Sequence, residues 1–178
     1  MKKLSLPLSS EEIRALRAGD SVSLSGTVYT ARDCAHKRMF ELLDEGKPLP
    51  FPLEGGFIYY AGPCPAPAGK ASGSCGPTTS ARMNVYAPRL LDLGLGGIIG
   101  KGEMSEEVRK AIVRNRKVYF AAIGGAGALY GNAIQSSECV AFPDLLSEAV
   151  HKLEIADFPL VVAIDSDGNT VYGKDGAR

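Results

Sequence analysis

The order of apolar and polar residues along the chain predicts alternating strands and helices. Residues 21–30 place Val22, Leu24, Gly26 and Val28 at alternate positions with serine and threonine between them, which is the period of a strand with one buried face. From Asp33 the apolar residues follow helical spacing instead, and Gly46 is a suitable stop. A strand therefore gives way to a helix close to residue 33.

The other predicted elements follow the same two periods. Ser9 and Glu12 have the spacing of a capping box, so we expect a short helix over 9–18. The remaining expected strands are 57–61, 97–100, 117–123, 138–142 and 160–164, and the remaining expected helices start at Thr78 and Ser105, follow the glycines at 124–127, and span 144–151. A turn at 165–169 leads to a closing hairpin through 170–172. This order is typical of an α/β fold, here a single layered domain with a mixed sheet over residues 1–178.

Residues 62–77 interrupt the regular order of elements. Glycine and proline are too frequent there for a helix or a strand, so we expect a long loop. A loop of this length within a compact domain is more often functional than not. We therefore take 62–77 as a candidate active-site loop.

The composition narrows the class of protein. The chain has 178 residues, 45% of them hydrophobic, which suffices for one substantial core. Its 20 basic and 20 acidic side chains cancel, so no excess positive charge is present to hold a nucleic acid or a membrane surface. The N-terminal apolar stretch is broken by Pro7 and Ser9, and we expect neither a signal sequence nor a membrane span. These features predict a cytoplasmic protein with no nucleic-acid or membrane partner.

The cysteines are scattered along the chain rather than grouped. They are Cys34, Cys64, Cys75 and Cys139. No Cys-x-x-Cys pair, as found in zinc ribbons and ferredoxin-type sites, is present. We therefore expect free thiols and no metal ligand in this chain.

Three groups of cationic and hydroxyl residues lie where a strand or a glycine-rich loop gives way to a helix. The first is Arg32, Asp33 and His36, the second is the run 76–83, and the third is Lys101 between two glycines. The second group contains Thr78, Thr79 and Arg82. Helix starts offer free backbone N–H groups, and arginine gives two-point contact to a carboxylate. Together the groups predict a receptor for a small anion.

Each group also has an ordinary structural explanation. Arg32 and Asp33 are compatible with a surface ion pair, and His36 with a solvent-facing or satisfied histidine. The threonines are compatible with a helix cap, and Lys101 with a turn. The coincidence of all three groups favours a site. His151 has no comparable neighbours in the sequence, and we assign it no role.

A glycine run at 124–131 suggests a rival function, dinucleotide binding. A strand, a glycine turn and a helix are the order that such a site requires. However, the third glycine of the pattern is replaced by Tyr130, and the preceding chain lacks the repeated β-α-β order. A tight packing turn is the better interpretation.

Five ordered motifs resemble the class I fumarate hydratase and L-tartrate dehydratase family, and in particular its C-terminal or beta part. The resemblance runs from about Gly19 to Asp165. The motifs are Tyr29-Thr30-Ala31-Arg32-Asp33-Cys34-Ala35-His36, Tyr60-Ala61-Gly62-Pro63, Gly76-Pro77-Thr78-Thr79-Ser80-Ala81-Arg82-Met83, Gly100-Lys101-Gly102 and Ala122-Ile123-Gly124-Gly125-Ala126.

The resemblance implies a swivelling β/β/α domain that closes over a four-iron four-sulfur cluster. That cluster would be ligated by a separate alpha subunit, which the scattered cysteines of this chain are consistent with. The implied activity is that of a hydro-lyase, the reversible hydration of fumarate to (S)-malate, in a homodimer or a heterotetramer that is active only with the alpha subunit.

The resemblance also implies roles for single residues. The dicarboxylate substrate would be bound by Arg32, Gly62, Thr78, Arg82 and Lys101. Thr79 matches the position of the family's proposed catalytic base, and Asp33 and His36 would orient Arg32 or move protons. A threonine hydroxyl is a weak base, so that role requires strong activation.

Two further functions remain open at the level of the sequence. Fumarate and tartrate differ by hydroxyl groups, and the groups that discriminate between them can lie on the partner subunit. An L-tartrate dehydratase beta subunit is therefore one alternative. A non-catalytic anion-binding domain is the other.

Overall fold

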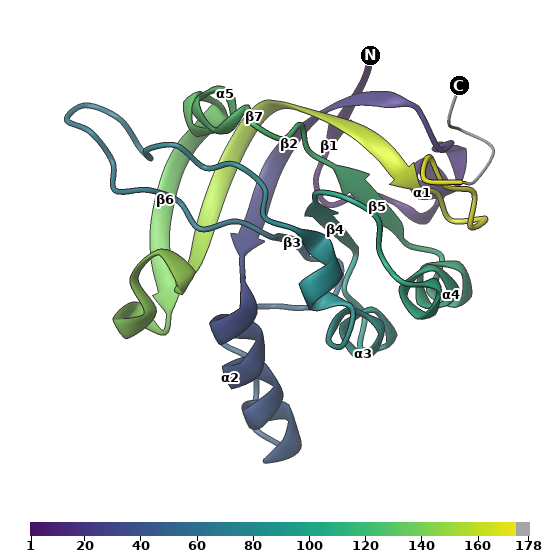
Figure 1. The fold of residues 1–178 in the computed structure, drawn as a ribbon, viewed down its shortest axis with the longest axis horizontal. Coiled ribbons are helices and arrows are strands. Elements are labelled where there is room, and N and C mark those ends of the chain that lie inside the picture. The colour runs from purple at the N-terminus through teal and green to yellow at the C-terminus, as the bar shows by residue number, and fades with distance from the viewer. Residues whose placement is uncertain (174–178) are drawn as a thin grey trace.

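A computed structural model describes residues 1–173, so the last five residues of the predicted domain, 174–178, lie outside the described part. Seven strands and five α-helices follow one another with two short 3₁₀ helices, η1 and η2 (Figure 1). In chain order they are β1 Lys2–Ser5, α1 Ser10–Ala15, β2 Ser21–Thr30, α2 Asp33–Asp44, β3 Phe57–Tyr59, η1 Ser80–Met83, α3 Ala87–Asp92, β4 Gly97–Gly100, α4 Glu106–Asn115, β5 Val118–Ala121, α5 Gly127–Ala133, β6 Ile134–Ala141, η2 Pro143–Glu148 and β7 Val150–Ile164. The predicted α/β fold with a mixed sheet is confirmed.

The strands form one sheet that curls on itself. Its order is β1-β2-β3-β4-β5-β7-β6, and β7 also pairs with β2. Neighbours from β1 to β5 are parallel, whereas β7 is antiparallel to β2, β5 and β6. Because β7 bonds to both β2 and β5, the strands β2, β3, β4, β5 and β7 close into a ring.

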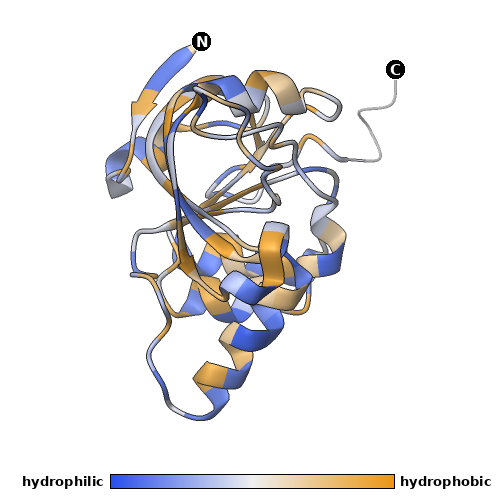
Figure 2. Cartoon of the chain, turned by 90° about the vertical axis from the view of Figure 1, so that its left-hand side faces the viewer, coloured by the Kyte–Doolittle hydropathy of each residue, from blue (hydrophilic) through white to orange (hydrophobic). Residues whose placement is uncertain are grey.

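The two faces of the sheet bury separate apolar clusters. Between the sheet and the helices α2, α3 and α4, Met39, Leu90 and Ile112 pack on Ile58 and Ile98. Inside the curl, Phe57, Ile99 and Phe158 belong to a second cluster. Strand residues are therefore apolar at successive positions, as expected for strands that are covered on both faces. Coloured by hydropathy, the helices carry both hydrophobic and hydrophilic residues along their turns (Figure 2).

Most of the predicted elements are present in the structure. The strand 21–30, the strand 97–100 and the helix that starts at Asp33 have the predicted positions. The capping box at Ser9 and Glu12 is confirmed, although its helix ends at Ala15. β1 was not expected, because its short segment carries too few apolar residues to show a strand period.

Two predicted helices are wrong. The helix expected from Thr78 is instead η1 followed by α3, because Thr79 is held extended by a parallel bridge to Lys101. The helix expected over 144–151 is η2, after which the chain enters β7 at Val150 rather than at Leu160. His151 therefore lies in a strand, where it pairs with Cys139. In both places pairing with distant strands outweighs the local helical pattern.

Candidate carboxylate-binding site

The parallel order of the strands explains how the candidate residues meet. α2, α3 and α4 connect parallel neighbours, so the carboxyl ends of β2 to β5 point to one edge of the sheet. Arg32, Gly62, Lys101 and Gly124 each follow the end of one of these strands by a few residues. Ligands of open parallel sheets bind at this edge.

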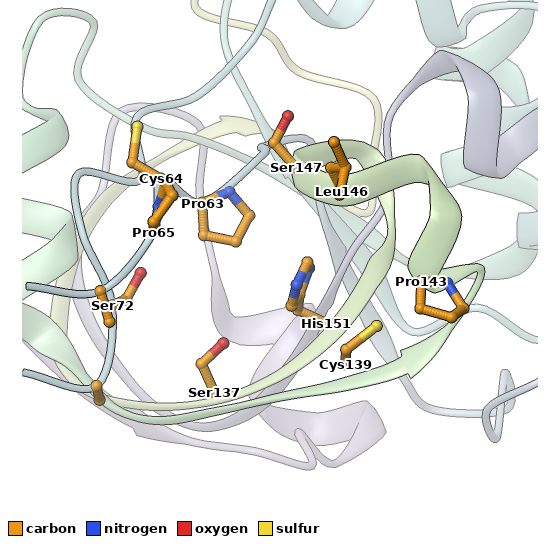
Figure 3. A pocket seen from close by; sticks show the side chains of 12 residues that line it. Pro63, Cys64, Pro65, Ser72, Ser137, Cys139, Pro143, Leu146, Ser147 and His151 are labelled. Carbon is orange, nitrogen blue, oxygen red and sulfur yellow. The ribbon is translucent and has the colours of Figure 1, made fainter.

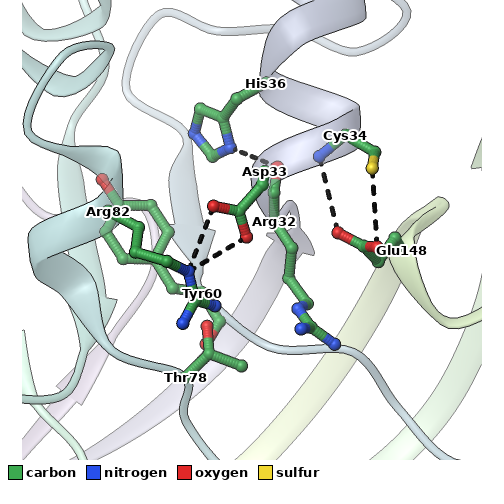
Figure 4. Close-up of polar contacts among 8 residues, drawn as sticks. All are labelled: Arg32, Asp33, Cys34, His36, Tyr60, Thr78, Arg82 and Glu148. Carbon is green, nitrogen blue, oxygen red and sulfur yellow. Dashed lines mark hydrogen bonds and ion pairs between the residues drawn. The ribbon is translucent and has the colours of Figure 1, made fainter.

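Arg32 joins the end of β2 to the start of α2, and His36 fixes its backbone. His36 Nδ1 lies 2.8 Å from the Arg32 carbonyl oxygen. A carbonyl only accepts, so the imidazole donates its Nδ1 proton there. His36 is fully buried against Tyr60 and Tyr86, and burial lowers its pKa to about 4, so the ring is neutral at pH 7. In Figure 4 the ring points away from the two arginines of the site.

The Arg32 side chain extends over the backbone of Gly62. A Cβ atom at Gly62 would lie 3.1 Å from the Arg32 Cδ and Nη1 atoms and 2.6 Å from the Ser147 carbonyl oxygen. Only glycine fits between α2 and η2 without a shift of one of them. The Arg32 Nε atom is buried and, among residues 1–173, has no hydrogen-bond partner. Gly62 therefore determines where the guanidinium of Arg32 lies.

Arg82 approaches the same region from η1 and pairs with Asp33. Its Nε atom is 3.1 and 3.3 Å from the two carboxylate oxygens of Asp33. Both side chains are partly open to solvent. In Figure 4 the Arg82 side chain points toward Thr78, whereas the Arg32 side chain extends down from the start of α2 and lies to the right of both. Asp33 thus orients one arginine while leaving the guanidinium nitrogens beyond Nε open to a ligand.

The two threonines are placed differently. Thr78 is tied to the end of β3, since its N–H and its hydroxyl both donate to the Tyr60 carbonyl oxygen, at 2.7 and 3.1 Å. Thr79 is exposed, and among the described residues its hydroxyl makes no hydrogen bond. Thr78 therefore presents lone pairs, whereas Thr79 presents a hydroxyl that can both donate and accept.

Lys101 completes the group from the end of β4. Its backbone bonds to Ser80, and its side chain runs along Gly124, where a Cβ atom would lie 3.2 Å from Lys101 Cδ. Within residues 1–173 no acidic side chain is within ion-pair distance of Lys101 or Arg32. The site thus has three cations, and only Arg82 is paired with a carboxylate.

The structure adds Glu148 to the site, which the sequence analysis missed. Its carboxylate accepts a long hydrogen bond from the Cys34 N–H, at 3.4 Å, and lies 3.5 Å from the Cys34 sulfur. Glu148 therefore caps α2 from η2, and the contact raises the pKa of the Cys34 thiol. No local signal could have revealed it, because Cys34 and Glu148 are 114 positions apart in the chain.

A cavity of about 710 Å³ opens beside the site, between the loop 62–77, β6, η2 and β7. Figure 3 shows Cys64, Cys139 and His151 on its walls. Pro63 and Ser147 separate it from Arg32 and Gly62. His151 thus faces a cavity outside the cationic group, and burial lowers its pKa.

Neither a group of metal ligands nor a membrane-spanning helix is found in the described part of the chain. Among residues 1–173, no group of three or more His, Cys, Asp or Glu side chains is placed to hold a metal. The four cysteines are unbridged thiols, as predicted, and Cys75 alone is buried. No helix in this part of the chain combines the length and the apolar character needed to cross a bilayer.

The glycine run at 124–131, which suggested dinucleotide binding, contains a side chain that packs in the core. Tyr130, at the position of the third glycine, is fully buried. Its hydroxyl accepts from the Ile123 N–H and donates to the Pro159 carbonyl oxygen, at 2.7 and 2.8 Å. A bulky side chain thus stands where the pattern needs glycine for close packing of the helix on the strand.

The chain is similar in sequence to proteins that are named fumarate hydratases. The sequence model of a family described as "Fumarase C-terminus" matches residues 2–175. Fumarate hydratase 2 of Leishmania major is 40% identical over 166 residues, which are 92% of this chain and 29% of that protein. The anaerobic class I fumarate hydratase of Escherichia coli (strain K12) is 42% identical over 153 residues, 85% of this chain and 28% of that protein.

A third relative has nearly the length of this chain. It is provisionally named L(+)-tartrate dehydratase subunit beta, from Methanocaldococcus jannaschii, and is 42% identical over 171 residues, 93% of this chain and 88% of that protein. The chain therefore spans less than a third of the two fumarate hydratases but almost all of the tartrate dehydratase subunit.

Proposed function

Because this chain belongs to the fumarase C-terminus family, we propose that it is the beta subunit of an iron–sulfur hydro-lyase that interconverts fumarate and (S)-malate. The observation that carries the proposal is the convergence of Arg32, Arg82 and Lys101 with the threonines 78 and 79 at one edge of the sheet. A substrate with two carboxylates requires such a group of cations.

The substrate carboxylates bind to the side chains of Arg32, Arg82 and Lys101. The Thr78 hydroxyl offers its lone pairs to a donor, because its own proton is engaged with Tyr60. Gly62 contributes by keeping Arg32 in place. When both carboxylates are held, the two carbon atoms of the double bond that water is added to are fixed in position. This orientation lowers the entropic part of the barrier.

Thr79 is the candidate for moving the proton at carbon. Its hydroxyl is exposed at the site, and it lies beside Lys101 through the parallel bridge. A cation near the hydroxyl favours its deprotonated form, which is the activation that a threonine base needs. In this proposal Asp33 and His36 act through the arginines, since Asp33 holds Arg82 and the buried His36 holds the Arg32 backbone.

The iron–sulfur cluster belongs to the partner in this proposal. The thiols of residues 1–173 do not fit a cluster, because no three possible ligands are grouped there and Cys75 is buried in the core. An alpha subunit with its own ligands would bring the cluster to the strand-end edge, and this chain would close over it. The assembly would be a homodimer or a heterotetramer, in the cytoplasm.

One observation favours a second substrate. The relative from Methanocaldococcus jannaschii matches this chain over 88% of its length and carries the name of a tartrate dehydratase subunit. The cations of the site suit either dicarboxylate. Discrimination then depends on hydrogen bonds to the substrate hydroxyls. A site that is built to bind a hydroxyl strongly rejects a substrate without it, because the polar groups of the site are then left unpaired.

The test is anaerobic co-purification of the chain with its iron–sulfur alpha partner. Loss of the ultraviolet absorbance of fumarate is followed for the mixture and for each subunit alone. We expect activity in the mixture only. A stable complex that is inactive on fumarate but dehydrates L-tartrate would establish the second substrate, and the absence of any complex would leave an anion-binding domain.

A further inference from the structure

Two buried hydroxyl groups, those of Ser80 and Tyr119, surround the backbone of the lysine of the proposed site. Lys101 has a flexible four-carbon stem, and it lies between Gly100 and Gly102, which impose little on the backbone. A lysine in such a segment would not keep one position by itself. Its position must come from neighbouring elements.

Ser80 provides the first contact. The Ser80 N–H donates to the Lys101 carbonyl oxygen at 2.9 Å, and the Lys101 N–H donates to Ser80 Oγ at 2.8 Å. Both backbone polar groups of the lysine are therefore satisfied by one residue of η1. A Cβ atom at Gly100 would overlap Ser80 Oγ, so this approach requires glycine at that position.

Tyr119 of β5 provides the second contact. Its hydroxyl lies 3.0 Å from Ser80 Oγ and 2.7 Å from the Gly102 carbonyl oxygen. A carbonyl can only accept, so the single tyrosine proton is given to Gly102, and the contact with Ser80 uses the proton of the serine. Burial raises the pKa of Tyr119, which keeps the phenol protonated.

We propose that Ser80 and Tyr119 are positioning residues for Lys101, and that they form a buried clamp which aims this lysine at a substrate carboxylate. Both side chains are fully buried, so neither touches the substrate itself. The clamp joins η1, β4 and β5, and it carries Thr79 and Lys101 as one unit. The inference rests on the proposed function, which gives Lys101 its ligand.

The clamp also explains why a serine follows the two threonines. Position 80 requires a hydroxyl group that accepts from the Lys101 N–H and donates to the Tyr119 hydroxyl. The close approach of Gly100 leaves no room there for a larger residue. Tyr119 showed no signal in the sequence beyond a place in an apolar strand. Its hydroxyl acquires a role only because β5 lies next to β4.

The first test measures amide hydrogen exchange at Lys101 in the full chain by nuclear magnetic resonance. Tyr119→Phe removes one hydroxyl and keeps the ring, and we expect the Lys101 amide to exchange about tenfold faster, since the loss of one hydrogen bond weakens its closure. The matched control is Tyr59→Phe on the neighbouring strand. It removes an equally buried hydroxyl, bonded to the Cys75 carbonyl oxygen at 2.7 Å, and should leave Lys101 exchange unchanged.

The second test uses the complex with the alpha partner and a thermodynamic cycle. Tyr119→Phe should raise the KM for the dicarboxylate roughly fivefold to tenfold with kcat changed by less than about twofold, and it should add nothing in a Lys101→Ala background. A loss of stability alone would not produce a change that depends on Lys101.

The outcomes separate this inference from the function on which it rests. Unchanged Lys101 exchange in Tyr119→Phe overturns the clamp, whatever the activity of the complex. Faster exchange with an unaltered KM, where Lys101→Ala does raise the KM, also overturns it, because the clamp would then not serve the site. An inactive complex refutes the proposed hydro-lyase, and the exchange measurement still decides whether the clamp exists.

Discussion

Single residues of the site differ in how far they are open to solvent, and this difference assigns their tasks. Arg82 is 45% exposed and Asp33 is 39% exposed, so their ion pair contributes little to stability. His36 and Ser80 are fully buried and bond to the backbone of a site residue. In the proposed site the solvent-accessible cations bind the substrate, and the buried polar groups position them.

We predict that Arg82→Ala lowers activity with little loss of stability. Removal of a charge-assisted contact to a carboxylate should reduce kcat/KM by on the order of 2 kcal/mol, or roughly thirtyfold. Steady-state kinetics of the complex measure this change. Arg89→Ala is a matched control, since Arg89 is also 45% exposed and pairs with Asp44, away from the site. Equal losses in both variants would contradict a specific role for Arg82.

We predict that the free energy of unfolding decreases as the pH falls, because His36 is buried in its neutral form. Its pKa is about 4 in the folded chain and about 6.5 when exposed. The unfolded state therefore binds a proton first, so the contribution of His36 is complete above pH 6.5 and is lost as the pH falls toward 4. The carboxylates with lowered pKa values act mainly at more acidic pH.

Urea unfolding at pH 7 and pH 5 measures this contribution. We expect His36→Leu to remove most of the difference between the two pH values. His151→Leu should remove less, because His151 is only partly buried although its pKa shift has the same direction. An unchanged difference in His36→Leu would show that another group titrates.

At the scale of elements, the strand ends are linked by close backbone approaches rather than by large interfaces. The loop 62–77 leaves β3 at Gly62, which touches both Arg32 and η2. The same loop returns to the sheet at Pro77, which bridges to Ala61. The two ends of the loop are therefore fixed, whereas its tip extends away from the sheet (Figure 1).

We predict that Gly62→Ala displaces Arg32 and raises the KM of the complex. Its Cβ atom would require a shift of Ser147 or of the arginine, and overpacking of this kind costs about 1–3 kcal/mol of stability. Gly69→Ala at the loop tip is the control. There the new Cβ atom meets no neighbour, and only the positive φ of 78° is strained. That variant should lose some stability but keep its KM; a KM raised equally by both would point to the loop as a whole.

At the scale of the whole molecule, the two apolar clusters tie the site to the global fold. Cys75, at the end of the loop, lies in the cluster inside the curled sheet. Burial raises the pKa of its thiol to about 12. Its reaction with a thiol reagent therefore requires the core to open.

We predict that three thiols of the native chain react quickly with a chromogenic disulfide reagent and that the fourth reacts only on unfolding. The fast group is Cys34, Cys64 and Cys139, all of which are exposed. The reaction is followed by absorbance at neutral pH with and without urea, and Cys75→Ser should abolish the slow phase alone. Four fast thiols in the native chain would show that the core is not closed around the loop.

The sequence by itself determined the alternation of strands and helices and which residues are candidates for the site. Short apolar strands and the helical period are specified within about ten residues, so 21–30, 97–100 and the helix from Asp33 were placed correctly. The motifs around Arg32, Thr78 and Lys101 were recognisable because cationic and hydroxyl residues coincide where strands or glycine-rich loops end. The family followed from their order and was confirmed.

Only the tertiary structure decided how these residues are held. The pairing of β7 with β2, β5 and β6 started that strand at Val150 rather than Leu160, and Glu148 in the preceding η2 lies at the start of α2. Likewise, the adjacency of β4 and β5 placed the Tyr119 hydroxyl beside Ser80 and Gly102. Such contacts join residues that are far apart in the chain, so no local pattern contains them, and pairing energy summed over long strands outweighs local propensity.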